Sequence, residues 1–284
     1  MTSDTVKRHI AYGPHPLQQM DVLVPKEYSP QTPVVFLIHG GGFIMGRKED
    51  FEVPAQLFCN EGFVVVNLSH RLIDASWFSK TNTPHASNVK VSDQLDDVDK
   101  AVRYFKKQAP GWGLDTSRLY VAGHSAGAIL GMLYLLQEGR HEDIRAAGNW
   151  AGITDLSLPT ELFPGFLQPW QRQHVQSIYD RMLDYSALTG GAGDAKPISP
   201  YWVAQKLGGK PVISLYPEHN VVLGMPGEAA LGMMQTKRFH ALLKSQGIPE
   251  KFSLYAGCDH SFRGGGNDTW LRCVRETAAF FRAH

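Results

Sequence analysis

The sequence predicts an α/β fold: a mainly parallel central sheet flanked by helices. Short apolar segments, such as residues 34–38 and 119–122, alternate with segments of helical periodicity along most of the chain. At 123–127, a glycine-containing turn joins one of these segments directly to a helix pattern. Because loops at the carboxyl ends of parallel strands border the active site in such sheets, we expect the functional groups to gather there.

The expected strands are short and apolar, and polar or glycine-containing segments separate them. The clearest is 34–38, whose residues are all apolar and partly β-branched, as in a strand buried on both faces. The other strands are expected at 62–67, 119–122, 148–151, 211–216 and 251–255.

A long helix is expected to begin near residue 91 and to end near Pro110–Gly111. Its apolar positions recur at spacings of four and three, and charged residues occupy its other faces. These positions are Val91, Leu95, Val98, Val102 and Phe105. A similar stripe predicts a C-terminal helix from about 268 to 281. We interpret both stripes as core packing.

The run Gly123–Gly127 has the pattern G-x-S-x-G between the strand at 119–122 and a helix pattern. In a nucleophile elbow of this kind, the glycines let two backbones pass closely. The serine is held on a strained turn with its hydroxyl toward the substrate. Ser125 is therefore the predicted covalent nucleophile.

A glycine-rich loop, His39–Phe43, follows the strand at 34–38. Hydrolases with a serine elbow turn backbone N–H groups of such a loop toward the oxyanion that develops on the substrate. Glycine is needed there because a side chain would block that approach. We expect His39 to brace the loop rather than to take part in the chemistry.

A histidine follows the last expected strand. His260 lies in the segment 257–262, after the strand at 251–255 and before the C-terminal helix. Serine first and histidine last is the chain order of hydrolases with this elbow. His260 is therefore the predicted base that accepts the proton of Ser125.

Together these motifs resemble the α/β-hydrolase superfamily. Within it they resemble the HGGG-type esterases, and most of all the group of kynurenine formamidases and BD-FAE feruloyl or acetyl esterases. The resemblance spans nearly the whole chain: 10–25 is similar to that group's first hairpin, and 115–119 to its approach to the elbow. It implies the α/β-hydrolase fold with a cap-like insertion, and no metal or organic cofactor. It also implies that the oxyanion is held by backbone N–H groups of Gly41, Gly42 and Ala126.

The function that the resemblance implies is a serine carboxylic-ester hydrolase, which acts on a small or aryl ester through an acyl-enzyme intermediate. Two alternatives stay open. The first is an arylformamidase or other amidase of the kynurenine formamidase type, because the same serine chemistry can cleave a formamide. The second is a hydrolase-like binding protein with weakened turnover, which only the acid position suggests.

The acid of the expected triad departs from the family pattern. The segment 217–222 resembles Gly-Glu-His-Asp, whose last residue is the catalytic acid, but this chain has Asn220 there. Replacing that acid by Asn in a serine protease lowers kcat about 10⁴-fold. Asn220 could orient the histidine without supplying charge, or Glu218 or Asp155 could supply a carboxylate instead. Alternatively, Asn220 is a substitution in a chain whose natural residue is Asp. We favour Asn220 in the acid position, and Glu218 next.

Residues 157–201 interrupt the alternation of strands and helices and form a candidate cap over Ser125. A helix is expected there at 169–188. The aromatic residues of this insertion favour an apolar or aromatic group on the substrate. We therefore expect better turnover of aryl or medium-chain esters than of acetate. The predicted substrate contacts are Phe43, His124, Phe163, Phe166 and Trp170.

Composition agrees with a single catalytic domain over residues 1–284, because 43% of the residues are hydrophobic. The formal net charge of +1 gives no reason to expect nucleic acid or a membrane surface as partner. The three cysteines, Cys59, Cys258 and Cys273, predict neither a disulfide framework nor a zinc site. The chain shows no apolar leader or membrane-spanning segment, so a cytoplasmic location is expected. The partner that the resemblance implies is a small-molecule ester. A homodimer is compatible with these features.

Overall fold

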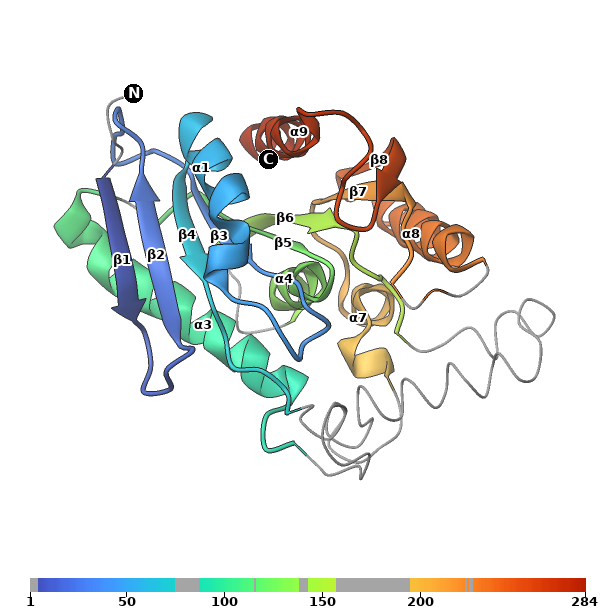
Figure 1. Ribbon diagram of the computed structural model, residues 1–284, viewed down its shortest axis with the longest axis horizontal. Helices are drawn as coiled ribbons and strands as arrows, with labels where there is room; N and C mark the ends of the chain where they lie inside the picture. The colour runs from blue at the N-terminus through green and yellow to red at the C-terminus, as the bar shows by residue number, and fades with distance from the viewer. Residues whose placement is uncertain are drawn as a thin grey trace.

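The computed structural model describes residues 5–74, 87–114, 116–137, 143–156, 195–222, 224 and 227–284. Its centre is an eight-stranded sheet with the order β1-β2-β4-β3-β5-β6-β7-β8 (Figure 1). In chain order the strands are β1 Thr5–Ala11, β2 Gln19–Val24, β3 Val34–Ile38, β4 Val64–Leu68, β5 Leu119–His124, β6 Ile144–Trp150, β7 Val212–His219 and β8 Glu250–Asp259.

The sheet is mainly parallel, as predicted. β1 pairs antiparallel with β2, and β2 pairs antiparallel with β4. Every neighbouring pair from β4 to β8 is parallel. Because parallel strands end at the same edge, the segments that follow β3, β5, β7 and β8 approach one another although they are far apart in the sequence.

Helices cover both faces of the sheet (Figure 1). α1 and α9 pack on one face, and α3, α4, α7 and α8 pack on the other. Their bounds are α1 Glu52–Asn60, α3 Val91–Gln108, α4 Ala126–Leu136, α7 Pro200–Leu207, α8 Glu228–Ser245 and α9 Thr269–Ala283. The elbow helix α4 is buried along its whole length, which agrees with its nearly uniform apolar sequence.

The alternation of side chains along β3 explains why this strand is apolar throughout. Val34, Phe36 and Ile38 enter the core cluster on the α3 and α4 face. Val35 and Leu37 enter the cluster on the α1 and α9 face. A strand covered by helices on both sides must place an apolar side chain at every position.

The expected strands and the two expected amphipathic helices are confirmed, but β6 begins at Ile144 rather than at 148, and β7 and β8 have longer C-terminal ends. The strand expected at 211–216 continues to His219 as β7. Proline has no N–H to donate to a neighbouring strand. Pro217 is tolerated in β7 because the pairing of β7 with β6 has already ended at Leu215. Sequence patterns did not indicate α1, α7 or α8; α1 and α7 are short, and α1 contains Pro54.

Most of the candidate cap lies outside the described residues, including the expected helix at 169–188. Only 195–201 of that segment is described, where a 3-10 turn at Lys196–Ile198 leads into α7. Residues 75–86, between β4 and α3, are likewise not described. Among the described helices, none combines the length and apolar character that a membrane crossing requires.

Candidate active site

Ser125 occupies the turn between β5 and α4, as the elbow prediction requires. Its backbone has φ 52° and ψ −122°, in a region that side-chain-bearing residues rarely adopt. The turn is held by a hydrogen bond from Ser125 N–H to Trp150 O at 2.8 Å. Strain of this kind persists only where the surroundings fix it, and it is common at reactive residues.

The glycines on either side of Ser125 make room for two close backbone contacts. A Cβ on Gly127 would lie 2.2 Å from Ile38 O and 2.3 Å from His39 O. A Cβ on Gly123 would lie 2.5 Å from the Gly127 carbonyl carbon. The elbow helix can therefore approach the end of β3 only with glycine at these positions.

The glycine loop after β3 lies directly against the elbow. A Cβ on Gly40 would lie 3.3 Å from Ser125 Cβ and 2.9 Å from His124 O. Gly41 and Gly42 have φ values of +115° and +60°, which favour glycine. The structure thus brings together two motifs that the chain separates by some eighty residues.

Internal hydrogen bonds fix the peptide groups of this loop. His39 Nδ1 donates to Gly40 O at 2.8 Å, and Gly41 O accepts from the N–H groups of Ile44 and Met45 at 3.1 and 3.0 Å. The C=O and N–H of one trans peptide point in opposite directions, so the N–H groups of Gly41 and Gly42 face away from these bonds.

The predicted oxyanion donors are available. Within the described residues, the N–H groups of Gly41, Gly42 and Ala126 donate no intramolecular hydrogen bond. His39 braces the loop as expected, and its ring stacks on that of His70 with centroids 4.3 Å apart. Burial lowers the pKa of His39, which favours the neutral form of this donor.

A residue that the sequence analysis missed also holds this loop. Gln94 on α3 is fully buried, and its Nε2 donates to Phe43 O at 2.7 Å and to Arg71 O at 2.8 Å. Phe43 has φ 69°, so this bridge supports a strained residue. No sequence signal distinguished Gln94 from other polar residues of its helix, because its acceptors come from two distant loops.

We expect Gln94→Leu to lower the free energy of unfolding by about 1–3 kcal/mol, because two hydrogen bonds, each worth about 0.5–1.5 kcal/mol, are lost. Denaturant titration measures this loss. The matched control is Gln205→Leu, at an exposed position of α7, with an expected change within about 0.5 kcal/mol. Equal stability of the two variants would contradict a structural role for the bridge.

The structure pairs His260 with Asn220. His260 follows β8, and Asn220 follows β7. Their closest polar atoms are His260 Nδ1 and Asn220 Oδ1, 2.5 Å apart. The amide oxygen can only accept, so Nδ1 carries the proton and Nε2 has a free lone pair. Asn220 itself is buried, with a relative exposure of 6%.

The two alternative acids have other partners. Glu218 Oε2 accepts from Gly257 N–H at 2.8 Å. Asp155 Oδ1 accepts from Trp202 Nε1–H at 3.1 Å, and Arg238 lies 3.7 Å from its other oxygen. Of the three candidates, only Asn220 is hydrogen-bonded to the His260 ring among the described contacts.

The environment of His260 favours a neutral imidazole. Burial lowers the pKa of His260, and the charge of Asp259 opposes that shift. Among the described contacts, no hydrogen bond joins the Ser125 hydroxyl to the His260 ring. Bonds of this kind are often long in unliganded hydrolases and tighten when substrate binds.

The five predicted substrate contacts fall into two groups. Phe163, Phe166 and Trp170 lie outside the described residues. Phe43 is buried in the core beside α3, and His124 packs against His260 with ring centroids 4.7 Å apart. For these two residues the structure shows packing contacts, and a contact with substrate stays a prediction.

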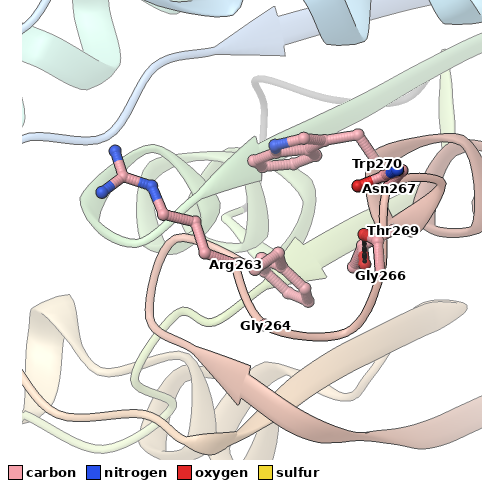
Figure 2. Close-up of a pocket in the computed structure, with 7 residues that line it drawn as sticks. Arg263, Gly264, Gly266, Asn267, Thr269 and Trp270 are labelled. Carbon is pink, nitrogen blue, oxygen red and sulfur yellow. Dashed lines mark hydrogen bonds between the residues drawn. The ribbon is translucent and has the colours of Figure 1, made fainter.

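An open pocket of about 460 Å³ lies on the segment that joins β8 to α9 (Figure 2). Arg263 belongs to this segment and Trp270 to the first turn of α9, and the ring centroids of Trp270 and His124 lie 6.3 Å apart. The pocket is therefore adjacent to the His260 loop. Its lining residues are Phe262, Arg263, Gly264, Gly266, Asn267, Thr269 and Trp270.

Solved structures with the same architecture are esterases by their titles. Esterase B from Lactobacillus rhamnosis, in an inhibited form, aligns with a TM-score of 0.73 and 16% identity over 98% of this chain and 86% of its own. The propionate-bound esterase Est2 from Thermogutta terrifontis aligns with a TM-score of 0.69 and 19% identity. The alignment covers 99% of this chain and 94% of Est2. The fold is therefore the α/β-hydrolase fold that the sequence predicted.

The alignments with curated relatives cover a smaller share of those proteins' own length. A probable isoprenylcysteine alpha-carbonyl methylesterase of Oryza sativa is 23% identical over 266 residues, which cover 91% of this chain and 59% of that protein. Gut esterase 1 of Caenorhabditis briggsae is 28% identical over 125 residues, 43% of this chain and 22% of its own. The chain thus spans about three-fifths of the length of the plant relative.

The family comparison agrees with the resemblance found in the motifs. The sequence model of the BD-FAE family matches residues 20–164, just over half of the chain. This match contains both the glycine loop after β3 and the Ser125 elbow. The chain therefore belongs to the BD-FAE family.

Proposed function

We propose that this protein is a serine carboxylic-ester hydrolase that works through an acyl-enzyme intermediate. The observation that carries the proposal is the contact between the glycine loop and the elbow, where Gly40 lies against Ser125. The contact supports the proposal because it brings a strained serine next to a loop whose Gly41 and Gly42 N–H groups donate no hydrogen bond among the described residues, as oxyanion stabilisation requires. The His260 ring, with its proton on Nδ1, supplies a base on the neighbouring loop.

The proposed reaction has two halves. Ser125 Oγ attacks the ester carbonyl carbon while His260 Nε2 accepts the hydroxyl proton, and the N–H groups of Gly41, Gly42 and Ala126 hold the oxyanion. Collapse of the tetrahedral intermediate breaks the bond to the leaving oxygen, which takes the proton from His260. Water then attacks the acyl-enzyme by the same route and releases the carboxylic acid and free Ser125.

The relatives support an ester as substrate. The names of the plant methylesterase and the gut esterase, and the titles of esterase B and propionate-bound Est2, all describe ester hydrolases. A small-molecule ester is accordingly the proposed substrate class of this chain. A cytoplasmic location and a homodimer stay predictions of the sequence.

Covalent labelling tests the proposal directly. A fluorophosphonate probe is expected to add one label to the chain, and peptide mass spectrometry is expected to place it on Ser125. Ser125→Ala is the control and should take up no label. An unlabelled parent chain, or a label that persists in Ser125→Ala, would contradict a Ser125 nucleophile. N-formylkynurenine, assayed beside a phenyl ester, tests the formamide alternative.

A p-nitrophenyl ester series tests the expected acyl preference. We expect kcat/KM to be higher for medium-chain acyl groups than for acetate, because an insertion rich in aromatic residues favours apolar groups. Best turnover with acetate, and a sharp loss as the acyl chain lengthens, would contradict an open apolar pocket on the acyl side.

A further inference from the structure

The residue before the nucleophile makes a specific contact with the base loop. His124 ends β5, and its Nε2 lies 2.7 Å from the backbone oxygen of His260. A carbonyl can only accept, so His124 carries its proton on Nε2 and donates it to this oxygen. The contact joins two residues 136 positions apart and ties the end of β5 to the loop after β8.

The other side of the His124 ring faces the glycine loop. A Cβ on Gly40 would lie 2.9 Å from His124 Nδ1, so Gly40 passes close to this edge of the imidazole. Nδ1 has no proton in this tautomer. One ring therefore touches both the loop that supplies the proposed oxyanion donors and the loop that supplies the proposed base.

Aromatic neighbours limit the positions that the ring can adopt. Phe51, Phe262 and Trp270 lie with ring centroids 6.2 to 6.4 Å from that of His124. The titratable groups whose charges act on His124 are His260 and Asp259. Burial, and then His260, lower the pKa of His124 to about 4, so the ring is a neutral donor near pH 7.

We propose that His124 is a positioning residue for the base: its Nε2–H holds the backbone carbonyl of His260 and thereby fixes the imidazole beside Ser125. This inference rests on the proposed function. The need for such an anchor is greater in this chain because the partner at His260 Nδ1 is the uncharged amide of Asn220. A neutral acceptor forms a weaker hydrogen bond than a carboxylate does.

Two substitutions of similar size separate the hydrogen bond from the volume of the ring. In His124→Gln, the amide nitrogen lies the same number of bonds from Cα as Nε2 does, so the donor is retained. In His124→Met, the side chain fills the same aromatic surroundings without a donor. We measure kcat and KM for a phenyl ester in the parent chain and in an Asn220→Asp background, with thermal melting to establish that each variant is folded.

We expect His124→Met to lower kcat about tenfold with KM changed less than about threefold, the factor produced by loss of one ordinary hydrogen bond. His124→Gln should restore kcat to within about threefold of its parent. If His124→Met keeps its parent's kcat, or folded His124→Gln loses as much as Met does, the inference is overturned. A chain inactive in both backgrounds would instead contradict the proposed function.

The histidine tautomer provides a test that does not depend on activity. Nitrogen NMR of histidine-labelled protein distinguishes the two neutral tautomers, and the signals that disappear in His124→Gln belong to His124. We expect a neutral ring with the proton on Nε2 at pH 7. A proton on Nδ1, or a charged ring, would overturn the inference even in an inactive chain.

Discussion

Asn220→Asp is expected to raise kcat for an ester several hundredfold or more. The substitution keeps the shape of the side chain and places a carboxylate oxygen where Asn220 Oδ1 now lies, 2.5 Å from His260 Nδ1. In the proposed mechanism, this carboxylate would stabilise the imidazolium that forms when His260 accepts the Ser125 proton. The reverse exchange in a serine protease costs about 10⁴ in kcat.

Asn220→Asp is also expected to change the pH dependence of kcat/KM. Burial lowers the pKa of His260 below its ordinary 6.5, so the parent should lose kcat/KM only as the pH falls below about that value. In Asn220→Asp, the new negative charge favours the protonated ring and raises its pKa. The acid limb of the profile should therefore shift to higher pH.

Unchanged or lower kcat in Asn220→Asp would contradict the assignment of Asn220 to the acid position. Glu218→Gln is the matched control, because Glu218 accepts from Gly257 N–H and makes no described contact with the His260 ring. We expect its kcat to stay within about threefold of the parent, well below the loss typical of a removed catalytic acid. A loss of several hundredfold in Glu218→Gln would transfer the acid role to that carboxylate.

Gly127→Ala is expected to destabilise the fold by about 4 kcal/mol or more, a large share of the stability of an ordinary domain. The added methyl would lie 2.2 Å from Ile38 O and 2.3 Å from His39 O, and these backbone atoms cannot rotate away as a flexible side chain can. Any relief must move α4 away from the end of β3. Hydrolysis should be lost with the same displacement.

Gly111→Ala is the control for this effect. Gly111 is exposed, and a Cβ there would meet nothing within 4 Å. We expect its free energy of unfolding to change by less than about 0.5 kcal/mol. Denaturant titration compares the two variants. A Gly127→Ala chain as stable as Gly111→Ala would contradict the close contact between α4 and β3.

The sheet and the main motifs could be predicted because each depends on residues that are close in the sequence. An unbroken apolar run predicts the strand β3, and an apolar stripe at helical spacing predicts α3. The elbow at Ser125 is a five-residue pattern between a strand and a helix. Local patterns of this kind specify backbone geometry directly.

The supports of the site could not be predicted because they depend on pairs of distant residues. Gln94 acts through carbonyls of two loops, and His124 through the backbone of His260. Neither contact leaves a periodic or compositional signal in the sequence. The sequence leaves open whether Asn220, Glu218 or Asp155 contacts His260. The pairing of β7 with β8 decides for Asn220, because it brings the loops that follow these two strands together.

The position of β8 at the edge of the sheet has a consequence for biosynthesis. A ribosome makes the elbow and the glycine loop well before it makes β8, which adds beside β7 and carries His260 at its end. In a nascent chain, Ser125 and the proposed oxyanion donors would therefore form before the proposed base is present. Under the proposed mechanism, the chain would hydrolyse esters only after this last strand has paired with β7. Unfinished chains would then have no esterase activity.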